Sequence, residues 1–456
     1  IFCQAGNIGI PARASALLAF VEPMVHAVKR PPGGLFHPKL WFAKYVDDQG
    51  NAAYRLLVLT RNLTNDRAWD IAVRLDSDGA SRRPLPVNDP LSRFLWDLPA
   101  RAVSPLPAAR RGRIMSLAEE ARHILWSLPE SAEELRFHYL PEDDLDTTGA
   151  RHLIVAPFMN EAGVQQLLAD TPGACVISRA EALDQLTAKR LAGLETFVLS
   201  EIPISDDEET LATNTLHGLH AKMFVIEPHG RARKARVLIG SANATDAALM
   251  KNVEFMVEFV GPRRHFGVDT FIGPDGSLFP LIEEYTSQGG EPPDAEVEER
   301  WQLENCLRSI AEIAHTVEVA ESSNGSGPFS LHVQAQKAYS LQRGWSVSVE
   351  LLTRPGIARE VTSGQPLDMT FDAVPKPDIT PFVCIRVSAE SGLSAGTVLL
   401  AKLINDPSDR LDVVLASEID TPEKFLRFVH LLLSLGSPCL MAVAAEGSGP
   451  GDPWRP

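Results

Sequence analysis

A short polar pattern occurs twice in this chain, and it constrains the fold more than any other feature. The first copy is His37-Pro38-Lys39, and Thr60-Arg61-Asn62 follows 21 residues after the lysine. The second copy is His220-Ala221-Lys222, with Gly240-Ser241-Ala242-Asn243 after a similar interval. In each copy the histidine and the lysine are two residues apart where an apolar run begins, so on a strand both side chains point to one face. Each asparagine follows the next apolar run, and it lies close to its own histidine and lysine if the two strands pair.

Both copies lie within the same order of predicted strands. The strands, three around each copy, are 39–46, 54–60, 70–75, 222–226, 236–239 and 254–260. The second copy is preceded by a strand at 153–157, a helix at 160–169 and a further strand–helix–strand at 174–177, 180–191 and 196–199. One α/β unit is therefore expected to occur twice. Because the first copy lacks the upstream strand and helix, we expect the natural chain to extend further N-terminally.

The remaining segments give weaker predictions. Residues 80–115 are rich in Pro and Arg and predict a connection, and 117–128 has helical spacing. Beyond the second copy, helices are predicted at 301–317 and 425–435, and strands at 329–334, 345–352, 383–387 and 397–403.

The repeated constellation resembles the phospholipase D superfamily, whose signature is HxK(x)4D followed by GSxN. The second copy matches closely, because Asn252-Val253-Glu254 stands where the family has a trailing NxE. In the first copy Thr60 replaces the usual serine. The family's aspartate is absent from both copies, with Lys44 and Glu227 at the corresponding positions. The resemblance covers roughly residues 1–262.

These residue types suit the hydrolysis of a phosphodiester without a metal or other cofactor. A neutral imidazole attacks phosphorus to form a phosphohistidine, and a second, protonated imidazole donates to the leaving oxygen. Lysine and asparagine donors stabilise the developing charge. The resemblance implies that His37 is the nucleophile and His220 the acid, and the reverse assignment stays open. The predicted catalytic residues are His37, Lys39, Asn62, His220, Lys222 and Asn243.

Other polar residues are candidates for orientation and binding. Each imidazole needs an acceptor on its second nitrogen; Glu254 corresponds to the family's orienting glutamate, and Asp70 is the candidate in the first half. Thr60 and Ser241 either bind phosphate or only shape their turns. Glu227 either has a functional role in the place of the family's aspartate or is only an exposed strand end. A basic hairpin is expected either to contact a nucleic-acid backbone or to be solvated. It contains Arg231, Arg233, Lys234 and Arg236.

Composition narrows the class of protein. Lys+Arg 43 against Asp+Glu 59 gives a net charge of −16, which disfavours unaided adhesion to bulk DNA or anionic lipid. No stretch reaches the roughly 18 uncharged apolar residues of a membrane span. The 5 cysteines are widely separated and form no CxxC pair, so neither a disulfide framework nor a zinc site is predicted. We expect a cytoplasmic protein that does not bind a membrane.

We therefore expect an α/β protein with two phospholipase D-like α/β/α sandwich halves sharing one active site, followed by a C-terminal α+β domain. The expected boundaries are 1–140, 141–290 and 291–456, the last comprising a helix and a small interaction domain. The expected function is that of a DNA nuclease of the kind found in bacterial restriction and anti-phage systems, with an ATPase or helicase as candidate partner. Two alternatives remain: a phospholipase or phosphatidyltransferase, and a degenerate subunit that binds DNA or docks onto a partner. Oligomeric state and the type of nucleic acid are left open.

Overall fold

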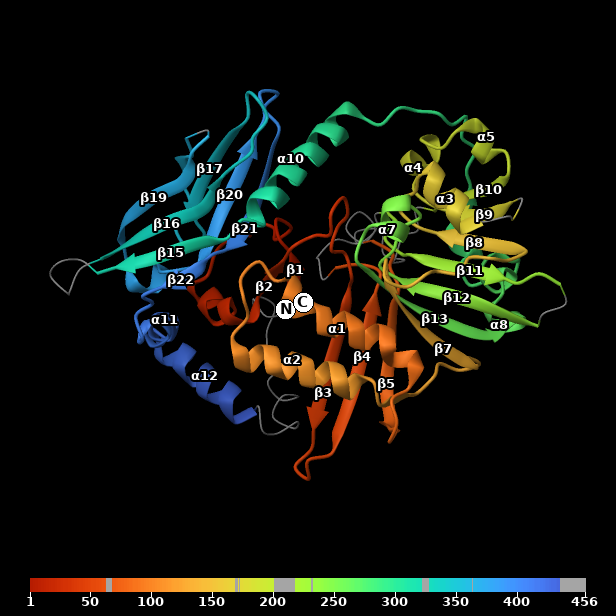
Figure 1. The fold of residues 1–456 in the computed structure, drawn as a ribbon, viewed down its shortest axis with the longest axis horizontal. Coiled ribbons are helices and arrows are strands. Elements are labelled where there is room, and N and C mark those ends of the chain that lie inside the picture. Colours follow the sequence, from red (N-terminus) through yellow and green to blue (C-terminus); the bar gives the residue numbers. More distant parts are fainter. Residues whose placement is uncertain are drawn as a thin grey trace. The chain divides into compact units, whose positions relative to one another are not determined.

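The structure is a computed structural model, and it describes residues 1–456 except 63–67, 169–170, 172, 201–217, 231–232, 322–327, 363 and 435–456. The chain forms two compact units (Figure 1). The larger unit comprises Phe2–Ala5 and Ala27–Trp301, and the smaller comprises Ile1, Gly6–His26 and Gln302–Pro456. The predicted boundary at residue 140 falls inside the larger unit, and the three-domain division stays a prediction. The expected mixture of helices and strands is confirmed.

An eight-stranded sheet forms the centre of the larger unit, in the order β14-β10-β9-β8-β11-β12-β13-β7. Only β8, β9 and β10 run parallel to one another, and the other pairs are antiparallel. The strands are β7 (Glu134–Leu140), β8 (Arg151–Val155), β9 (Ala174–Ile177), β10 (Leu194–Leu199), β11 (Met223–Glu227), β12 (Lys234–Gly240), β13 (Glu254–Pro262) and β14 (Ile282–Glu284). Both faces of this sheet are covered, so its central strands are apolar throughout rather than alternating.

Short helices cover the two faces. On one face α3 (Glu161–Leu168), α4 (Ala180–Asp184) and α7 (Asp246–Met250) pack into a core with β8, β9, β11 and β12. On the other face, the C-terminal end of α8 (Arg263–Phe266) and α9 (Val268–Ile272) pack against Leu153, Val155 and Val225. A further short helix, α5 (Ala188–Leu191), precedes β10.

A second, four-stranded antiparallel sheet carries the first copy of the pattern. Its order is β3-β4-β5-β6, with β3 (Leu40–Val46), β4 (Ala52–Leu59), β5 (Ala72–Ala80) and β6 (Ile124–Trp126). One face contributes Leu56, Val58, Val73 and Leu75 to a core that also contains residues of α1 (Asp89–Arg101), α2 (Ala108–Ala121), β7 and β13. Burial on one face alone explains the alternating exposure along β4 and β5.

The predicted strands around both copies are confirmed, and their ends differ by one to a few residues. The predicted connection at 80–115 is wrong, because α1 and most of α2 lie there. Pro90 occupies the first turn of α1, where its missing N–H breaks no helical hydrogen bond. The predicted helix at 117–128 is wrong beyond Ala121, because β6 follows. The helix predicted at 301–317 is shifted: α10 is Ala295–Ala311, and β15 (His315–Ala320) comes next.

The smaller unit contains two four-stranded sheets, in the orders β19-β16-β15-β22 and β18-β17-β20-β21. Their remaining strands are β16 (Phe329–Ala338), β17 (Ser346–Leu351), β18 (Arg359–Glu360), β19 (Pro366–Val374), β20 (Phe382–Ser388), β21 (Ser394–Leu400) and β22 (Lys402–Ile404), and the helices are α11 (Arg410–Glu418) and α12 (Pro422–Ser434). The N-terminal residues join this unit: the carbonyl of Ile8 accepts from the backbone N–H of Val398 at 2.8 Å. The first two strands, β1 (Phe2–Gln4) and β2 (His26–Val28), form a separate small sheet. In the part of the chain that the structure describes, no helix combines the length and apolarity needed to cross a bilayer.

Candidate active site

The first His-Lys pair directly precedes β3, and it lies against the second copy of the pattern. Phe36 forms a parallel bridge with Val253, and the backbone N–H of His37 donates to the carbonyl of Val253 at 2.9 Å. Gly34 permits this approach, because a Cβ there would lie 2.3 Å from the carbonyl oxygen of Lys251. Long-range pairing therefore brings His37 beside Glu254, the first residue of β13.

Glu254 holds the imidazole of His37. Nδ1 lies 3.1 and 3.0 Å from the two carboxylate oxygens, and the side-chain amide of Asn252 donates to Oε1 at 3.0 Å. Burial opposes the charge on Glu254, but the charge and hydrogen bond of His37, together with the charge of Lys39, outweigh it and lower the pKa of Glu254. Burial lowers the pKa of His37 despite the attraction of Glu254. A neutral His37 that donates from Nδ1 leaves the lone pair of Nε2 for attack on phosphorus.

Both lysines are buried and are anchored by backbone carbonyls. Nζ of Lys39 donates to the carbonyl of His37 at 2.8 Å, and Nζ of Lys222 donates to those of His220 at 2.9 Å and Thr60 at 3.1 Å. Burial lowers the pKa of Lys39 to about 7 and that of Lys222 to about 8, although Glu254 opposes both shifts. Burial disfavours the charged form of each lysine. A bound phosphate would therefore stabilise each ammonium group strongly, because its negative charge offsets the effect of burial.

Thr60 and Ser241 have the same role in the two halves. The hydroxyl of Thr60 accepts from the N–H of Ile71 at 2.9 Å, and the hydroxyl of Ser241 accepts from that of Phe255 at 3.0 Å. Each hydroxyl also donates to the carbonyl of the same residue, at 3.2 and 3.4 Å. These contacts are those of turn-shaping residues. They also make Asp70, which precedes Ile71, the structural counterpart of Glu254.

The second histidine enters its strand by the same pairing. The backbone N–H of His220 donates to the carbonyl of Trp69 at 2.8 Å, and Trp69 forms a parallel bridge with Leu219. Asp70 follows directly, as Glu254 follows Val253. Its carboxylate contacts Arg61 instead, with Oδ2 3.2 Å from Nε. The segments around the two copies of the pattern thus contact each other reciprocally, but Glu254 and Asp70 have different partners.

The two asparagines differ in what surrounds them. Oδ1 of Asn243 is buried, and no described residue hydrogen-bonds to it. The turn that carries Asn243 lies against α3, where a Cβ on Gly163 would be 2.3 Å from the carbonyl oxygen of Ala244. Asn62 is exposed just after β4.

The residues at the positions of the family's aspartate lie away from this cluster. Lys44 is on the surface and pairs with Glu120 at 2.8 Å. The interpretation of Glu227 as an exposed strand end is wrong, because this residue is 2% exposed. Its Oε1 accepts from the N–H of Val268 at 2.8 Å and its Oε2 pairs with Arg263 at 2.6 Å, so it secures the start of α9.

The basic hairpin is largely engaged in ion pairs. Lys234 lies 2.9 Å from both Glu133 and Glu134, and Arg236 lies 3.1 Å from Asp146. Arg233 is exposed, and Arg231 lies outside the described residues. Among all the described residues, no group of three or more His, Cys, Asp or Glu side chains could hold a metal ion.

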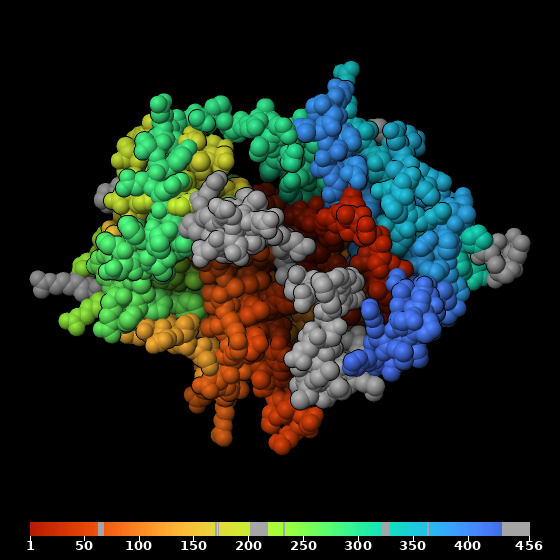
Figure 2. Space-filling model, turned by 180° about the vertical axis from the view of Figure 1, so that it is seen from behind, coloured from red at the N-terminus to blue at the C-terminus, as the bar shows by residue number. Residues whose placement is uncertain are grey.

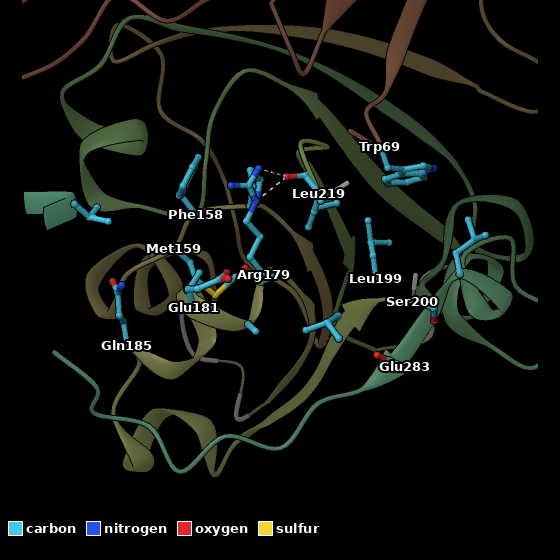
Figure 3. Close-up of a pocket in the computed structure, with 18 of the residues that line it drawn as sticks. Trp69, Phe158, Met159, Arg179, Glu181, Gln185, Leu199, Ser200, Leu219 and Glu283 are labelled. Carbon is cyan, nitrogen blue, oxygen red and sulfur yellow. Dashed lines mark hydrogen bonds between the residues drawn. The ribbon is translucent and has the colours of Figure 1, made fainter. Parts of the chain in front are cut away.

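A cavity of about 1020 Å³ opens beside the second half-site, next to Gly218 and Leu219 (Figure 3). Arg179 lines this cavity, and its Nε and one terminal nitrogen donate to the carbonyl of Leu219 at 3.0 and 2.9 Å. Its guanidinium also lies 5.0 Å from the ring centroid of Phe158. Trp69 lies on the other side of Arg179 from Phe158. Arg179 thus fixes the backbone that leads into His220.

This cavity has no local motif in the sequence, but it lies where the order of strands places one. Phe158 and Arg179 follow the carboxyl ends of the parallel strands β8 and β9. Ligands in open α/β sheets bind beyond these strand ends. The order of predicted strands therefore contained a signal for the cavity, although no local motif marked it.

No family model and no curated protein matches this chain. Among solved structures, the chain is similar to Nuc from Salmonella typhimurium, a phospholipase D family member, with 16% sequence identity and a TM-score of 0.23. That comparison covers 34% of this chain and 99% of the other.

Proposed function

We propose that this chain is a phosphodiesterase of the phospholipase D type, in which each half contributes one His-Lys pair to a single site. The observation that carries the proposal is the reciprocal contact between the halves. Glu254 of the second half binds His37 of the first, and Lys222 of the second half donates to the carbonyl of Thr60 in the first. Two separate half-sites facing different surfaces would not exchange contacts in this way.

In the proposed reaction, Nε2 of His37 attacks phosphorus and the bond to the leaving oxygen breaks. His220 gives its proton to that oxygen, which yields an alcohol and a phosphohistidine. His220 then accepts a proton from water, and the resulting hydroxide displaces His37 from phosphorus. Lys39 and Lys222 stabilise the negative charge that builds on the phosphate oxygens.

We further propose that the diester is in nucleic acid, DNA first, and that the protein serves bacterial restriction or anti-phage defence with an ATPase or helicase partner. Its net charge of −16 supports delivery of the substrate by a partner, because such a chain repels bulk DNA. The two half-sites would then act on a strand that the partner presents.

The test is cleavage of a panel of labelled DNA and RNA, single- and double-stranded, in EDTA. We expect the wild-type chain to cut at least one of them, and His37→Ala and His220→Ala to lower the rate by about 10³-fold or more. His265→Ala, an exposed histidine on α8, is the matched control and should leave the rate unchanged. Equal cleavage by all four chains would contradict the proposal. Phospholipid vesicles form a parallel arm, and hydrolysis there without cleavage of any oligonucleotide would favour the phospholipase.

A further inference from the structure

An exposed aromatic face continues from the first half-site along β3. Side chains on a strand alternate between its two faces, so Trp41 and Tyr45 share one face of β3. Lys39 directly precedes this strand, and its carbonyl accepts from the N–H of Leu59 at 2.8 Å, so the ladder of β3 and β4 extends back to the His-Lys pair. Trp41 is 56% exposed and Tyr45 is 54% exposed. The side chains on the opposite face of β3, such as Phe42, pack against the core instead. Two large rings are therefore presented to solvent on the strand that leaves the site, in the part of the larger unit that Figure 2 shows in red-orange.

The register of the sheet places arginines beside these rings. Trp41 pairs with Leu57, which pairs with Arg74 in the next strand; Ala43 pairs with Arg55. Small residues lie next to the rings: Ala43 lies between them along β3, and Ala53 lies opposite Tyr45 on β4. The resulting exposed surface contains Trp41, Ala43, Tyr45, Ala53, Arg55 and Arg74, and we call it the β3 face.

Arg55, Arg74 and Asp76 together carry one net positive charge. Asp76 lies between the two arginines, with one carboxylate oxygen 2.6 Å from Nε of Arg55 and the other 2.6 Å from a terminal nitrogen of Arg74. Two guanidinium groups thus share one carboxylate, which leaves one net positive charge beside two rings. Aromatic side chains with arginines nearby are the means by which proteins hold unpaired bases and their backbone.

The distances along the strand suit a nucleic acid. At roughly 3.3 Å per residue, Trp41 is about 7 Å from Lys39 and Tyr45 is about 13 Å beyond Trp41. A single-stranded nucleic acid whose phosphate lies at His37 and Lys39 can therefore place bases farther along the same molecule against the two rings. A duplex cannot use the rings in this way, because its base faces are already stacked.

We propose that the β3 face binds the unpaired part of a single-stranded nucleic acid whose scissile phosphate lies at the two half-sites. This proposal rests on the proposed function and specifies its substrate: single strands, or duplexes with a single-stranded end.

The experiment measures binding apart from cleavage. A His220→Ala background removes hydrolysis, and fluorescence anisotropy in EDTA gives the affinity for a labelled single-stranded oligonucleotide and for the matching duplex. Trp41→Ala/Tyr45→Ala should weaken single-strand binding by about tenfold or more, since each stacked base contributes substantially to affinity. Trp96→Ala is the matched control, because this tryptophan on α1 is 52% exposed and lies outside the β3 face. Trp41→Phe should retain the affinity but lose part of the tryptophan quenching that bound bases produce.

Cleavage then provides a second readout. In the chain with both histidines, the double variant should lose at least tenfold more activity on single-stranded DNA than on bis(p-nitrophenyl) phosphate, which is too small to span the face. Equal affinity of the double variant and the control would overturn the proposal. It would also be overturned if the chain forms a dimer that dissociates when Trp41 and Tyr45 are substituted. If the wild type cuts none of the substrates and the double variant still loses single-strand binding, the proposed function is contradicted. The proposal that the β3 face binds single strands is then still supported.

Discussion

His37 is bound by a carboxylate that lies 217 positions later in the chain. The contact fixes which nitrogen of the imidazole carries the proton, and desolvation lowers the pKa of His37, which favours the neutral ring. Both are what a nucleophilic histidine requires. The first prediction concerns this pair.

Glu254→Gln should lower the pKa of His37 further, because the substitution removes the negative charge that stabilises the imidazolium. It should also lower the cleavage rate by about 10²–10⁴-fold, because the amide no longer orients the ring. NMR titration of His37 and single-turnover cleavage measure the two effects. The matched control is Glu258→Gln, a buried glutamate on the same strand whose partner is His138 at 2.7 Å. A control that changes the pKa of His37 equally would show that the effect is not specific to Glu254.

The lysines make activity depend on pH. Their folded-state pKa values, about 7 for Lys39 and about 8 for Lys222, mean that both ammonium groups lose their protons as the pH rises through this range. We expect kcat/KM of the free enzyme to fall as the pH rises above about 7–8, because uncharged lysines no longer stabilise the phosphate. On the acid side kcat/KM should fall only below the ordinary range of imidazole, because the pKa of His37 is lowered. A pH profile that stays flat up to pH 10 would contradict the role of the lysines.

At the scale of the elements, short contacts between backbones position the polar side chains. The turn that carries Asn243 lies against α3 only because residue 163 is a glycine. Gly163→Ala should destabilise the protein by about 1–3 kcal/mol and lower cleavage, because the added methyl group displaces that turn. Gly112→Ala is the matched control: Gly112 is in α2, and a Cβ there would meet nothing within 4 Å. The control should stabilise the protein by about 0.5–1 kcal/mol. Urea unfolding of both variants measures the two changes in the free energy of unfolding, which should have opposite signs.

Local sequence patterns predicted some of the helices and strands and missed others. Strands β3, β4, β11, β12 and β13 were predictable, because their apolar runs are long and bounded by turns. Helices α1 and α2 were missed, because several of the Pro and Arg residues that indicated a connection lie within the helices: Pro90 and Pro99 in α1, and Arg111 and Arg113 on the exposed face of α2. Composition alone does not distinguish an exposed helical face from a loop; the position of each residue relative to the core does.

At the scale of the whole molecule, the N-terminal residues complete the smaller unit. Arg410 at the start of α11 is buried and pairs with Glu22, with a terminal nitrogen 2.7 Å from Oε2. Residues almost 400 positions apart are thereby joined in one core. Nothing local in either segment indicated this contact.

Arg410→Met should destabilise the smaller unit by about 3–5 kcal/mol, because Glu22 then remains buried without its partner. The neighbouring Lys376→Met is the matched control; it breaks the more exposed pair with Asp409 and should change stability by less than about 1 kcal/mol. Calorimetry should show the loss in one transition, while cleavage at the larger unit's site persists below that transition. A loss of equal size in both variants would contradict the assignment of Glu22 to a buried pair.

The sequence by itself predicted the residue types of the candidate site: a histidine and a lysine where one strand begins, and an asparagine where the next strand ends, in two copies. Alternation along a strand is local, so two residues two apart must share a face. Only the tertiary structure decided which carboxylate serves which histidine, since Glu254 reaches His37 of the other half while Asp70 contacts Arg61. It also decided where the cavity beside Leu219 lies and which face of β3 stays exposed. These features depend on register and packing between segments far apart in the chain, and such contacts leave no periodic trace in the sequence.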